Sequence, residues 1–459
     1  MESFWDYSVW GTLNVVAILL LSLLAANVVK RSIALLRGSL IPTSVLGGSM
    51  LIVVAGVYKL ITGNVMFDEP FFGGNGTVTL EVLTYHSLAL GFIASTLKSS
   101  KNKLTKKRTH EIFNTGVTTV STYLLQGIVG LAITMVAAHL VPGFFPAAGI
   151  LLPFGYGQGT GQALNYGGIF EHDFGFVGGK SFGLTIAALG FLSASIGGVI
   201  HLFILKRRGK ILANAAKAKN LRSEDIQADN EIPMQESMDK MTVQVALITV
   251  SYLLAYLFMF LLGLVLPGMR SVIYGFNFLL GVLAATVVKL ILKLFRKYGF
   301  GTREYTNDFL MTRASNFFFD LMVVAGVAAI RLGVLKDYWG IILIMGVIGA
   351  IITYIYNYYV AHRLFPEYPE EQFLTMYGML TGPASTGIIL LREIDSEFST
   401  PASENMVYQN FPAIVFGFPL MLLATMAPVQ PGLTLLILTA FFGVMNAILF
   451  WPGTKKKNK

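Results

Sequence analysis

Apolar runs of about 20 residues recur along the whole chain, and they limit its possible folds more than any other feature. Each run is long enough for an α-helix to cross roughly 30 Å of hydrocarbon. The alternating strands of about ten residues that build membrane barrels do not appear. Of the 459 residues, 54% are hydrophobic and 13% are charged, whereas soluble domains carry about 25% charged residues. We therefore expect an all-α polytopic membrane protein.

The apolar pattern predicts eleven spans. They fall at residues 8–29, 43–62, 83–99, 112–140, 181–205, 241–266, 271–295, 309–331, 338–361, 407–427 and 432–451. The first run follows Glu2 and Asp6 rather than lysines, and it is too long for a cleaved signal peptide. It is expected to remain as a spanning helix.

The distribution of basic residues predicts the orientation in the membrane. With the N-terminus outside and the C-terminus cytoplasmic, the inner side holds all but five of the 34 Lys and Arg residues, the exceptions being Lys59, Lys180, Arg270, Arg331 and Lys336. This asymmetry is the positive-inside rule. The net charge of +9 therefore needs no nucleic-acid partner, and we expect a multi-pass protein of the cell inner membrane.

Several classes of chemistry find no support in the sequence. The chain has no cysteine, which excludes disulfides and thiolate-bound metals, and its six histidines form no HExxH-like spacing. No GxxxxGK[ST] motif indicates an ATP-driven pump. We expect no organic cofactor, and ion gradients remain as the energy source.

The predicted spans divide into two halves. Residues 206–240 are polar and read as a cytoplasmic linker, with five spans before it in residues 1–205 and five after it in residues 241–427. Residues 428–459 add a further helix and a basic tail. Because the first half has an odd number of spans, the second half starts from the opposite side of the membrane. The two halves are therefore expected to be inverted repeats.

A Gly-rich break occupies the same place in each half. The first, at about 144–166, contains "PFGYGQGTGQALNYGG", and the second, at about 371–393, contains "MYGMLTGPASTGIILLREID"; Thr160 and Ser385 lie 225 positions apart. Broken hydrophobic segments at matching places are a sequence sign of a transporter's binding site. The helices on either side of each break place both ends of the break on the same side of the membrane. Each break is therefore expected to be a re-entrant hairpin.

The first break combines flexible backbone with neutral polar side chains. Glycines let backbone groups approach a ligand, and a half-helix N-terminus favours a carboxylate. The candidate substrate-binding residues here are Gly157, Gln158, Gly159, Thr160, Gly161, Gln162 and Asn165. A GxxxG packing face made by Gly157 and Gly161 is the alternative interpretation.

The second break contains backbone carbonyl and side-chain hydroxyl oxygens that could bind a ligand. Pro383 lacks an N–H and so frees a backbone carbonyl. The candidate substrate-binding residues are Thr381, Gly382, Ser385 and Thr386, and the candidate sodium ligands are Thr381, Pro383 and Ala384. Sodium is a hard cation that takes such ligands. A simple proline kink is the alternative.

Charged residues at membrane depth are further candidates because their burial is costly. Asp320 lies in the middle of the eighth span, with Asn316 one turn earlier; it could ligate sodium, relay a proton or pair with a polar neighbour. Arg392 follows the second break and could clamp a carboxylate, or pair with Glu393 or Asp395.

The motifs "IPTSVLGG" at 41–48, "GQGTGQA" at 157–163 and "GMLTGPAST" at 378–386 resemble those of the bacterial sodium/glutamate symporters. The resemblance implies two inverted five-helix repeats with re-entrant hairpins, a homodimer, an elevator-type transport domain and sodium-coupled glutamate uptake. The matching positions are Gly157, Gly159, Thr160, Gly161, Gly378, Gly382 and Thr386. Tyr156 and Gln158 stand where the family commonly has glycine and histidine, and Tyr156 is expected to narrow the site.

Other functions were weighed beside transport. The partners expected are sodium, the lipid bilayer, a second copy of the chain and a small organic anion, either glutamate or another amino acid or carboxylate. An intramembrane serine hydrolase using Ser385 would need a base within reach, whereas most of the histidines fall near predicted membrane surfaces. A passive channel would not need paired inverted hairpins. The protein is therefore expected not to be an enzyme.

Overall fold

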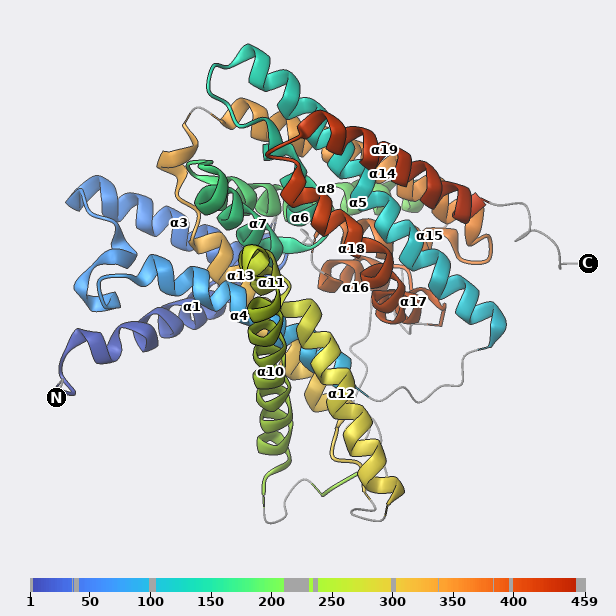
Figure 1. Ribbon diagram of the computed structural model, residues 1–459, viewed down its shortest axis with the longest axis horizontal. Coiled ribbons are helices and arrows are strands. Elements are labelled where there is room, and N and C mark those ends of the chain that lie inside the picture. The colour runs from blue at the N-terminus through green and yellow to red at the C-terminus, as the bar shows by residue number, and fades with distance from the viewer. Residues whose placement is uncertain are drawn as a thin grey trace, which may run out of the picture. The chain divides into compact units, whose positions relative to one another are not determined.

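The computed structural model describes residues 3–34, 36, 41–98, 105–209, 231–233, 238–298, 303–336, 338–382, 384–395 and 399–450. Within these ranges the chain is built from helices (Figure 1). A single isolated β-bridge in the described part joins Glu231 and Glu304.

Within the described ranges, ten helices are long and apolar enough to cross a membrane. They are α1 (Tyr7–Ser32), α3 (Thr43–Thr62), α4 (Gly76–Leu97), α5 (Lys106–Leu140), α8 (Gly179–Arg207), α10 (Lys240–Val265), α12 (Asn277–Lys297), α13 (Asp308–Ala328), α14 (Trp339–Leu364) and α19 (Pro431–Phe450). The chain is thus an all-helical, multi-pass membrane protein, as its hydropathy predicts.

Two predicted spans are divided in the structure. The seventh becomes α11 (Arg270–Gly275) followed by α12, and the tenth becomes α17 (Ala402–Tyr408) followed by α18 (Asn410–Met426). The tenth bends by 52° at this break. The additional eleventh span is confirmed as the helix α19.

Short helices make up the two predicted breaks and the connections. The first break contains η3 (Pro146–Ile150), α6 (Leu151–Tyr156) and α7 (Gly159–Phe174), and the second contains α15 (Pro369–Thr381) and α16 (Ala384–Arg392). Helix α7 continues beyond residue 166, where the first hairpin was expected to end. Single 3₁₀ turns occur at η1 (Met66–Asp68), η2 (Pro70–Phe72), η4 (Pro267–Met269) and η5 (Leu332–Leu335).

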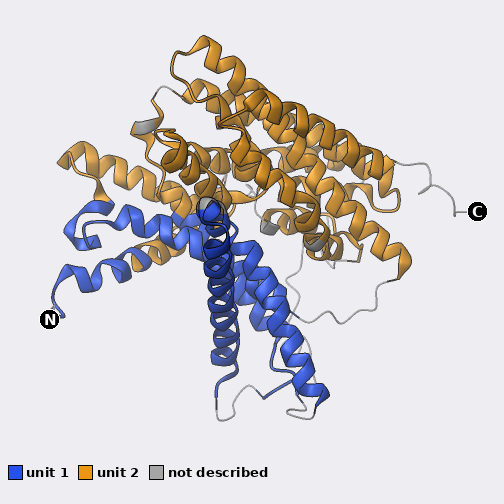
Figure 2. Ribbon diagram, viewed as in Figure 1, with its two compact units in different colours: residues 1–16, 67–103, 218–325 blue, residues 17–66, 104–217, 326–459 orange. Residues whose placement is uncertain are grey.

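The chain contains two compact units, and each takes segments from both halves of the sequence (Figure 2). Unit 1 comprises residues 1–16, 67–103 and 218–325, and unit 2 comprises residues 17–66, 104–217 and 326–459. Both broken helix pairs belong to unit 2. The proposed boundaries of the two sequence repeats stay a prediction.

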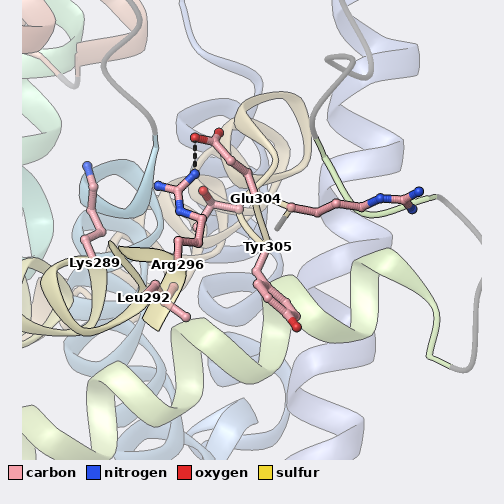
Figure 3. Close-up of a pocket in the computed structure, with 7 residues that line it drawn as sticks. Lys289, Leu292, Arg296, Glu304 and Tyr305 are labelled. Atoms are coloured by element: carbon pink, nitrogen blue, oxygen red, sulfur yellow. Dashed lines mark hydrogen bonds and ion pairs between the residues drawn. The ribbon is translucent and has the colours of Figure 1, made fainter. Parts of the chain in front are cut away.

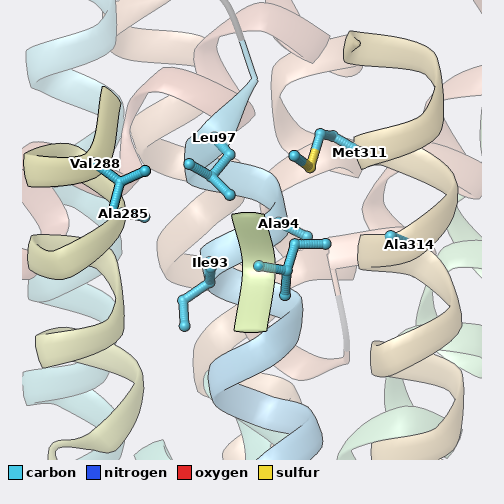
Figure 4. Close-up of a cluster of buried hydrophobic side chains, with 8 residues drawn as sticks. Ile93, Ala94, Leu97, Ala285, Val288, Met311 and Ala314 are labelled. Carbon is cyan, nitrogen blue, oxygen red and sulfur yellow. The ribbon is translucent and has the colours of Figure 1, made fainter. Parts of the chain in front are cut away.

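Unit 1 is centred on a small apolar core between α4, α10, α12 and α13 (Figure 4). Its buried members include Ile93, Leu97, Ile248, Val288 and Met311. Polar groups add directional contacts inside the unit, since Asn277 Nδ2 donates to the Tyr85 carbonyl at 2.9 Å and Ser315 Oγ donates to the Gly91 carbonyl at 2.9 Å. Burial and hydrogen bonding together fix the register of these helices.

The end of the predicted linker is held against unit 1 by a buried ion pair. Lys240 Nζ lies 2.8 Å from Glu231 Oε2, and both side chains are almost fully buried. Asn307 Nδ2 donates to the same carboxylate oxygen at 2.6 Å. Asp239 caps α10 by accepting from the backbone N–H of Met241 at 2.8 Å, which fixes where the helix begins.

Unit 2 is organised around the long helix α5, against which η3, α14, α18 and α19 pack. Helices α5 and η3 cross in close contact at two glycines. A Cβ added at Gly149 of η3 would lie 1.8 Å from the Gly130 carbonyl oxygen of α5. Thr134 Oγ1 donates to the Pro146 carbonyl at 2.7 Å and accepts from Gly149 N at 3.0 Å. Small residues allow this backbone contact, which fixes the start of the first hairpin.

Candidate functional site

The first broken segment folds back on itself. Helix α6 ends at Tyr156 and α7 begins at Gly159, whose φ of +79° lies in the left-handed region that favours glycine. The rings of Phe154 and Tyr166 stack at a centroid distance of 3.9 Å, so the two limbs lie side by side. The glycine-rich stretch thus interrupts the helix between two packed limbs, and a re-entrant hairpin in the membrane stays a prediction.

The second broken segment also folds back. Helix α15 ends at Thr381, the backbone is extended at Gly382, and α16 begins at Ala384. A Cβ added at Gly378 would lie 2.7 Å from Gly387 Cα, so the limbs touch through their backbones. Pro383 and the side chains of Ala384 and Ser385 lie outside the described residues.

Helix α5 holds both breaks. Tyr123 OH donates to the Gly157 carbonyl at 3.1 Å, and Gln126 Nε2, one turn later, donates to the Leu380 carbonyl at 2.9 Å. The same Gln126 amide reaches Thr353 Oγ1 of α14 at 2.9 Å. Breaks that are far apart in sequence therefore meet at one turn of α5.

Helix α8 contacts both breaks from another side. A Cβ added at Gly190 would lie 2.5 Å from the Thr381 carbonyl oxygen and 2.8 Å from the Tyr156 ring. At Ser193 the backbone carbonyl accepts from Tyr377 OH at 3.0 Å. The tips of the two hairpins thus converge between α5, α8 and α14, which makes this the candidate site.

Three buried polar atoms at the breaks have no hydrogen-bond partner within the described part of the chain: Gln158 Oε1, Gln162 Nε2 and Thr386 Oγ1. An unpaired buried polar group costs about 1–3 kcal/mol, so each needs a reason. Together they offer one amide donor, one amide acceptor and one hydroxyl. This set can both donate hydrogen bonds to a polar ligand and accept them from it.

The remaining predicted residues of the first hairpin lie in the same place. Thr160 and Gly161 are buried in the first turn of α7, and Asn165 Nδ2 donates to Gln162 Oε1 at 3.3 Å. In the second hairpin, Thr381 Oγ1 donates to the Tyr377 carbonyl at 2.6 Å. The hydroxyl proton of Thr381 is therefore used inside α15.

Three predicted residues lie elsewhere. Asn316 and Asp320 are on an exposed face of α13 and belong to unit 1 rather than to the unit that holds the hairpins. Arg392 is exposed in the last turn of α16. Their roles in binding stay predictions.

The positioning residues Tyr123, Gln126, Ser193 and Thr353 were missed from the sequence. A signal existed for α5, since the stretch "FNTGVTTVSTYLLQG" at 113–127 is unusually polar for a spanning helix and most of its polar residues are buried. Polar residues in a membrane helix usually face the bundle interior, but their partners cannot be read from spacing.

Tyr156 packs between helices instead of projecting from the break. Its OH lies 2.5 Å from the Gly346 carbonyl of α14 and 3.1 Å from Ser193 Oγ of α8. We expect Tyr156→Phe to lower the free energy of unfolding by about 1 kcal/mol, because a buried carbonyl loses its donor. Substrate competition profiles should stay unchanged. A change in which anions compete for binding would show instead that Tyr156 shapes the site, as the sequence suggested.

Asp395 fixes the chain where it leaves the second hairpin. Its carboxylate accepts from the backbone N–H groups of Ser399 and Thr400, each at 2.8 Å, and from both hydroxyls. Burial alone would raise the pKa of Asp395, but these hydrogen bonds outweigh it and lower the pKa below its usual value.

Because this pKa is lowered by folding, the carboxylate stabilises the folded state above about pH 4 and the contribution disappears as the pH falls through the folded pKa. We expect Asp395→Asn to cost about 2 kcal/mol at neutral pH. The difference between the two proteins should shrink on acidification, as followed by thermal unfolding at a series of pH values. A difference that is constant with pH would contradict the role of the charged form.

Unit 1 contains a shallow open pocket at the end of α12, lined by Lys289, Leu292, Arg296, Arg303, Glu304, Tyr305 and Thr306 (Figure 3). Arg296 donates to Glu304 at 2.6 Å, and Lys289 Nζ donates to the Lys98 carbonyl at 2.6 Å. These contacts tie α12 to the segment before α13 and to the end of α4.

Neither models of known protein families nor curated proteins give a match to this chain. The class is therefore defined by the fold and the site: a multi-pass helical membrane protein in which two broken helix pairs bring polar groups together.

Proposed function

We propose that the protein is a secondary transporter that imports a small organic anion, glutamate or a related carboxylate, together with sodium. The observation that carries this proposal is the convergence of two helix breaks on one turn of α5, with buried polar atoms in both breaks that have no hydrogen-bond partner among the described residues. Irregular backbone at membrane depth is tolerated where it lines a cavity or is buried in protein. A ligand site between such breaks is how many secondary transporters hold their substrate.

The chemistry of the breaks supports an anion accompanied by a cation. In the proposed complex, Gln162 Nε2 donates to a substrate carboxylate, helped by the N–H groups at the start of α7. Gln158 Oε1 and Thr386 Oγ1 face sodium or the substrate's ammonium group. The assignment of glutamate rests on the resemblance of the break motifs to those of the sodium/glutamate symporters.

The transport mechanism that we propose is alternating access of the elevator type. Both hairpins belong to unit 2, which supports their moving together as one body, with unit 1 contributing to the scaffold of a homodimer. The inverted repeats belong to this proposal, as does the orientation with the N-terminus outside and the C-terminus cytoplasmic in the inner membrane. Depth measurements that find both hairpin tips fixed in inward- and outward-facing states would reject the elevator.

The test is uptake of radiolabelled glutamate by purified protein in liposomes, with and without an inward sodium gradient. Aspartate, other dicarboxylates and neutral amino acids serve as competitors. Sodium-driven accumulation against a concentration gradient is expected, and it would also exclude a passive channel. If no anion accumulates under any gradient, the proposal is wrong.

One further measurement separates transport from hydrolysis at Ser385. A fluorophosphonate probe labels an activated serine, so it should leave the intact protein unlabelled. Covalent labelling that is lost in Ser385→Ala would instead support the intramembrane hydrolase.

A further inference from the structure

Two histidines contact one carboxylate in unit 2, at the base of the second hairpin, and a tyrosine contacts one of these histidines. Glu370 lies in the first turn of α15. Its Oε2 is 3.0 Å from His201 Nε2 of α8, and its Oε1 is 3.5 Å from His362 Nε2 of α14. His201 Nδ1 in turn lies 2.7 Å from Tyr354 OH. Three helices thus meet at a single carboxylate.

The cluster is buried among aromatic rings. The His201 side chain is 3% exposed and that of Glu370 is 10% exposed, whereas His362 is 31% exposed. Phe373 packs on the His201 ring with 4.4 Å between centroids, and Tyr358 packs on the His362 ring at 4.0 Å. The carboxylate is therefore shielded from solvent, and His362 is the member of the cluster that can exchange protons with water.

The hydrogen-bonding capacity of His362 shows that its contacts need an additional proton. Its Nδ1 lies 2.9 Å from the Tyr358 carbonyl, which only accepts, so Nδ1 must carry hydrogen. A neutral imidazole then has a lone pair on Nε2, and that lone pair would face Glu370 Oε1. The lone pair on His362 Nε2 and the negative charge of the Glu370 carboxylate repel each other. A proton on either Nε2 or Oε1 is therefore required to make the contact favourable.

His201 needs no additional proton. A neutral ring with hydrogen on Nε2 donates to Glu370 while its Nδ1 accepts from the Tyr354 hydroxyl, so one tautomer satisfies both contacts. The additional proton therefore belongs to the contact between His362 and Glu370. A metal ion is disfavoured as the occupant, since among the described residues no group of three His, Asp or Glu side chains is arranged to hold one.

We propose that Glu370 and His362, with His201 as the positioning residue, form a proton-binding site that controls the base of the second hairpin. With the proton bound, α8, α14 and α15 are joined at Glu370. When the proton leaves through His362, a buried carboxylate faces a lone pair and the contact weakens. The consequence for transport rests on the proposed function, because the second hairpin forms half of the candidate substrate site.

The position of the cluster in the fold favours a bound proton. His362 lies in the last turn of α14, where the helix dipole stabilises a cation. Arg208, at the end of α8, also acts electrostatically on His201 and opposes additional positive charge. Among the described residues, Tyr354 and Tyr358 of α14 also face the cluster.

The test uses Glu370→Gln, because a glutamine amide donates to His362 Nε2 without any added proton. Thermal unfolding of the purified full-length protein is measured from about pH 5 to 8.5, and sodium-driven uptake is measured over the same range. In the wild type the bound proton favours the folded state, so the unfolding midpoint should fall as the pH rises through the neutral range. In Glu370→Gln this fall should disappear.

Uptake by the wild type should change about fivefold or more across this range, in line with typical coupling between sites. The variant should show a flat profile. His172→Gln is the matched control, because His172 contacts Asp173 at 2.6 Å on the surface of the same unit, and it should retain the wild-type profile. If Glu370→Gln does not fold, His362→Gln at the more exposed position should remove the same transition.

The two proposals fail in distinguishable ways. The proton site is overturned if a folded Glu370→Gln or His362→Gln protein shows the same pH dependence of the unfolding midpoint as the wild type. This holds whatever the uptake data show. A transition in stability that depends on Glu370, in a protein that accumulates no anion, would support the proton site and overturn the proposed transport.

Discussion

Thr386→Val is expected to stabilise the empty protein and at the same time to reduce uptake of the anion strongly. Thr386 is fully buried, and its Oγ1 has no hydrogen-bond partner among the described residues. Valine has nearly the same shape and removes the unsatisfied hydroxyl, so the free energy of unfolding should rise by about 1 kcal/mol. If this hydroxyl contacts substrate or sodium, uptake should fall at least about tenfold.

The opposite signs of the two effects make this prediction specific. Thr434→Val is the control: Thr434 is also fully buried, but its Oγ1 donates at 2.8 Å to the carbonyl of Gln430, the residue before α19. It should leave uptake unchanged. Thermal unfolding and liposome uptake of both variants provide the measurement. Normal uptake by Thr386→Val would exclude this hydroxyl from the site, and lower stability would mean that it has a partner in the folded protein.

Gly149→Ala should have the largest effect on folding. The new methyl group would lie 1.8 Å from the Gly130 carbonyl oxygen and 2.6 Å from Leu131 N, and these are backbone atoms of α5 that cannot rotate away. Separating α5 from η3 also breaks the hydrogen bonds of Thr134. We expect a loss of at least about 3 kcal/mol of stability and, because the first hairpin starts here, loss of uptake.

Gly443→Ala is the matched control for this substitution. Gly443 lies in the interior of α19, and an added Cβ meets no heavy atom within 4 Å. Alanine favours a helix over glycine by up to about 1 kcal/mol, so this variant should be as stable as the wild type or slightly more stable. Size-exclusion profiles and unfolding midpoints compare the two. A Gly149→Ala protein with wild-type stability would show that the glycine crossing is not close in solution.

Local sequence patterns predicted most of the helices and both breaks. Spans follow from runs of apolar residues, because a helix in lipid must satisfy its own backbone and cover it with apolar side chains. The sequence places the first break within about residues 144–166, and the structure interrupts the helix inside this range, at Gly157 and Gln158, next to Gly159 with its left-handed conformation. These features depend on residues near one another in the chain, so the sequence is enough.

The histidines show where such patterns stop being informative. No spacing in the sequence relates His201, His362 and Glu370, and the histidines appeared scattered near the membrane surfaces. Their contacts join three helices and cross up to 169 positions of the chain. Local periodicity describes which face of a helix is apolar, but it does not say which other helix that face meets.

The sequence by itself determined the class of this protein, the ranges that contain the two Gly-rich breaks, and the neutral polar chemistry of the first break. The tertiary structure alone decided that both breaks meet at Tyr123 and Gln126 of α5, that Tyr156 packs between α8 and α14, and that Asp320 belongs to the other unit. The reason is physical. Backbone dihedrals and burial in lipid are set by each segment on its own, whereas hydrogen bonds between helices depend on how distant segments pack.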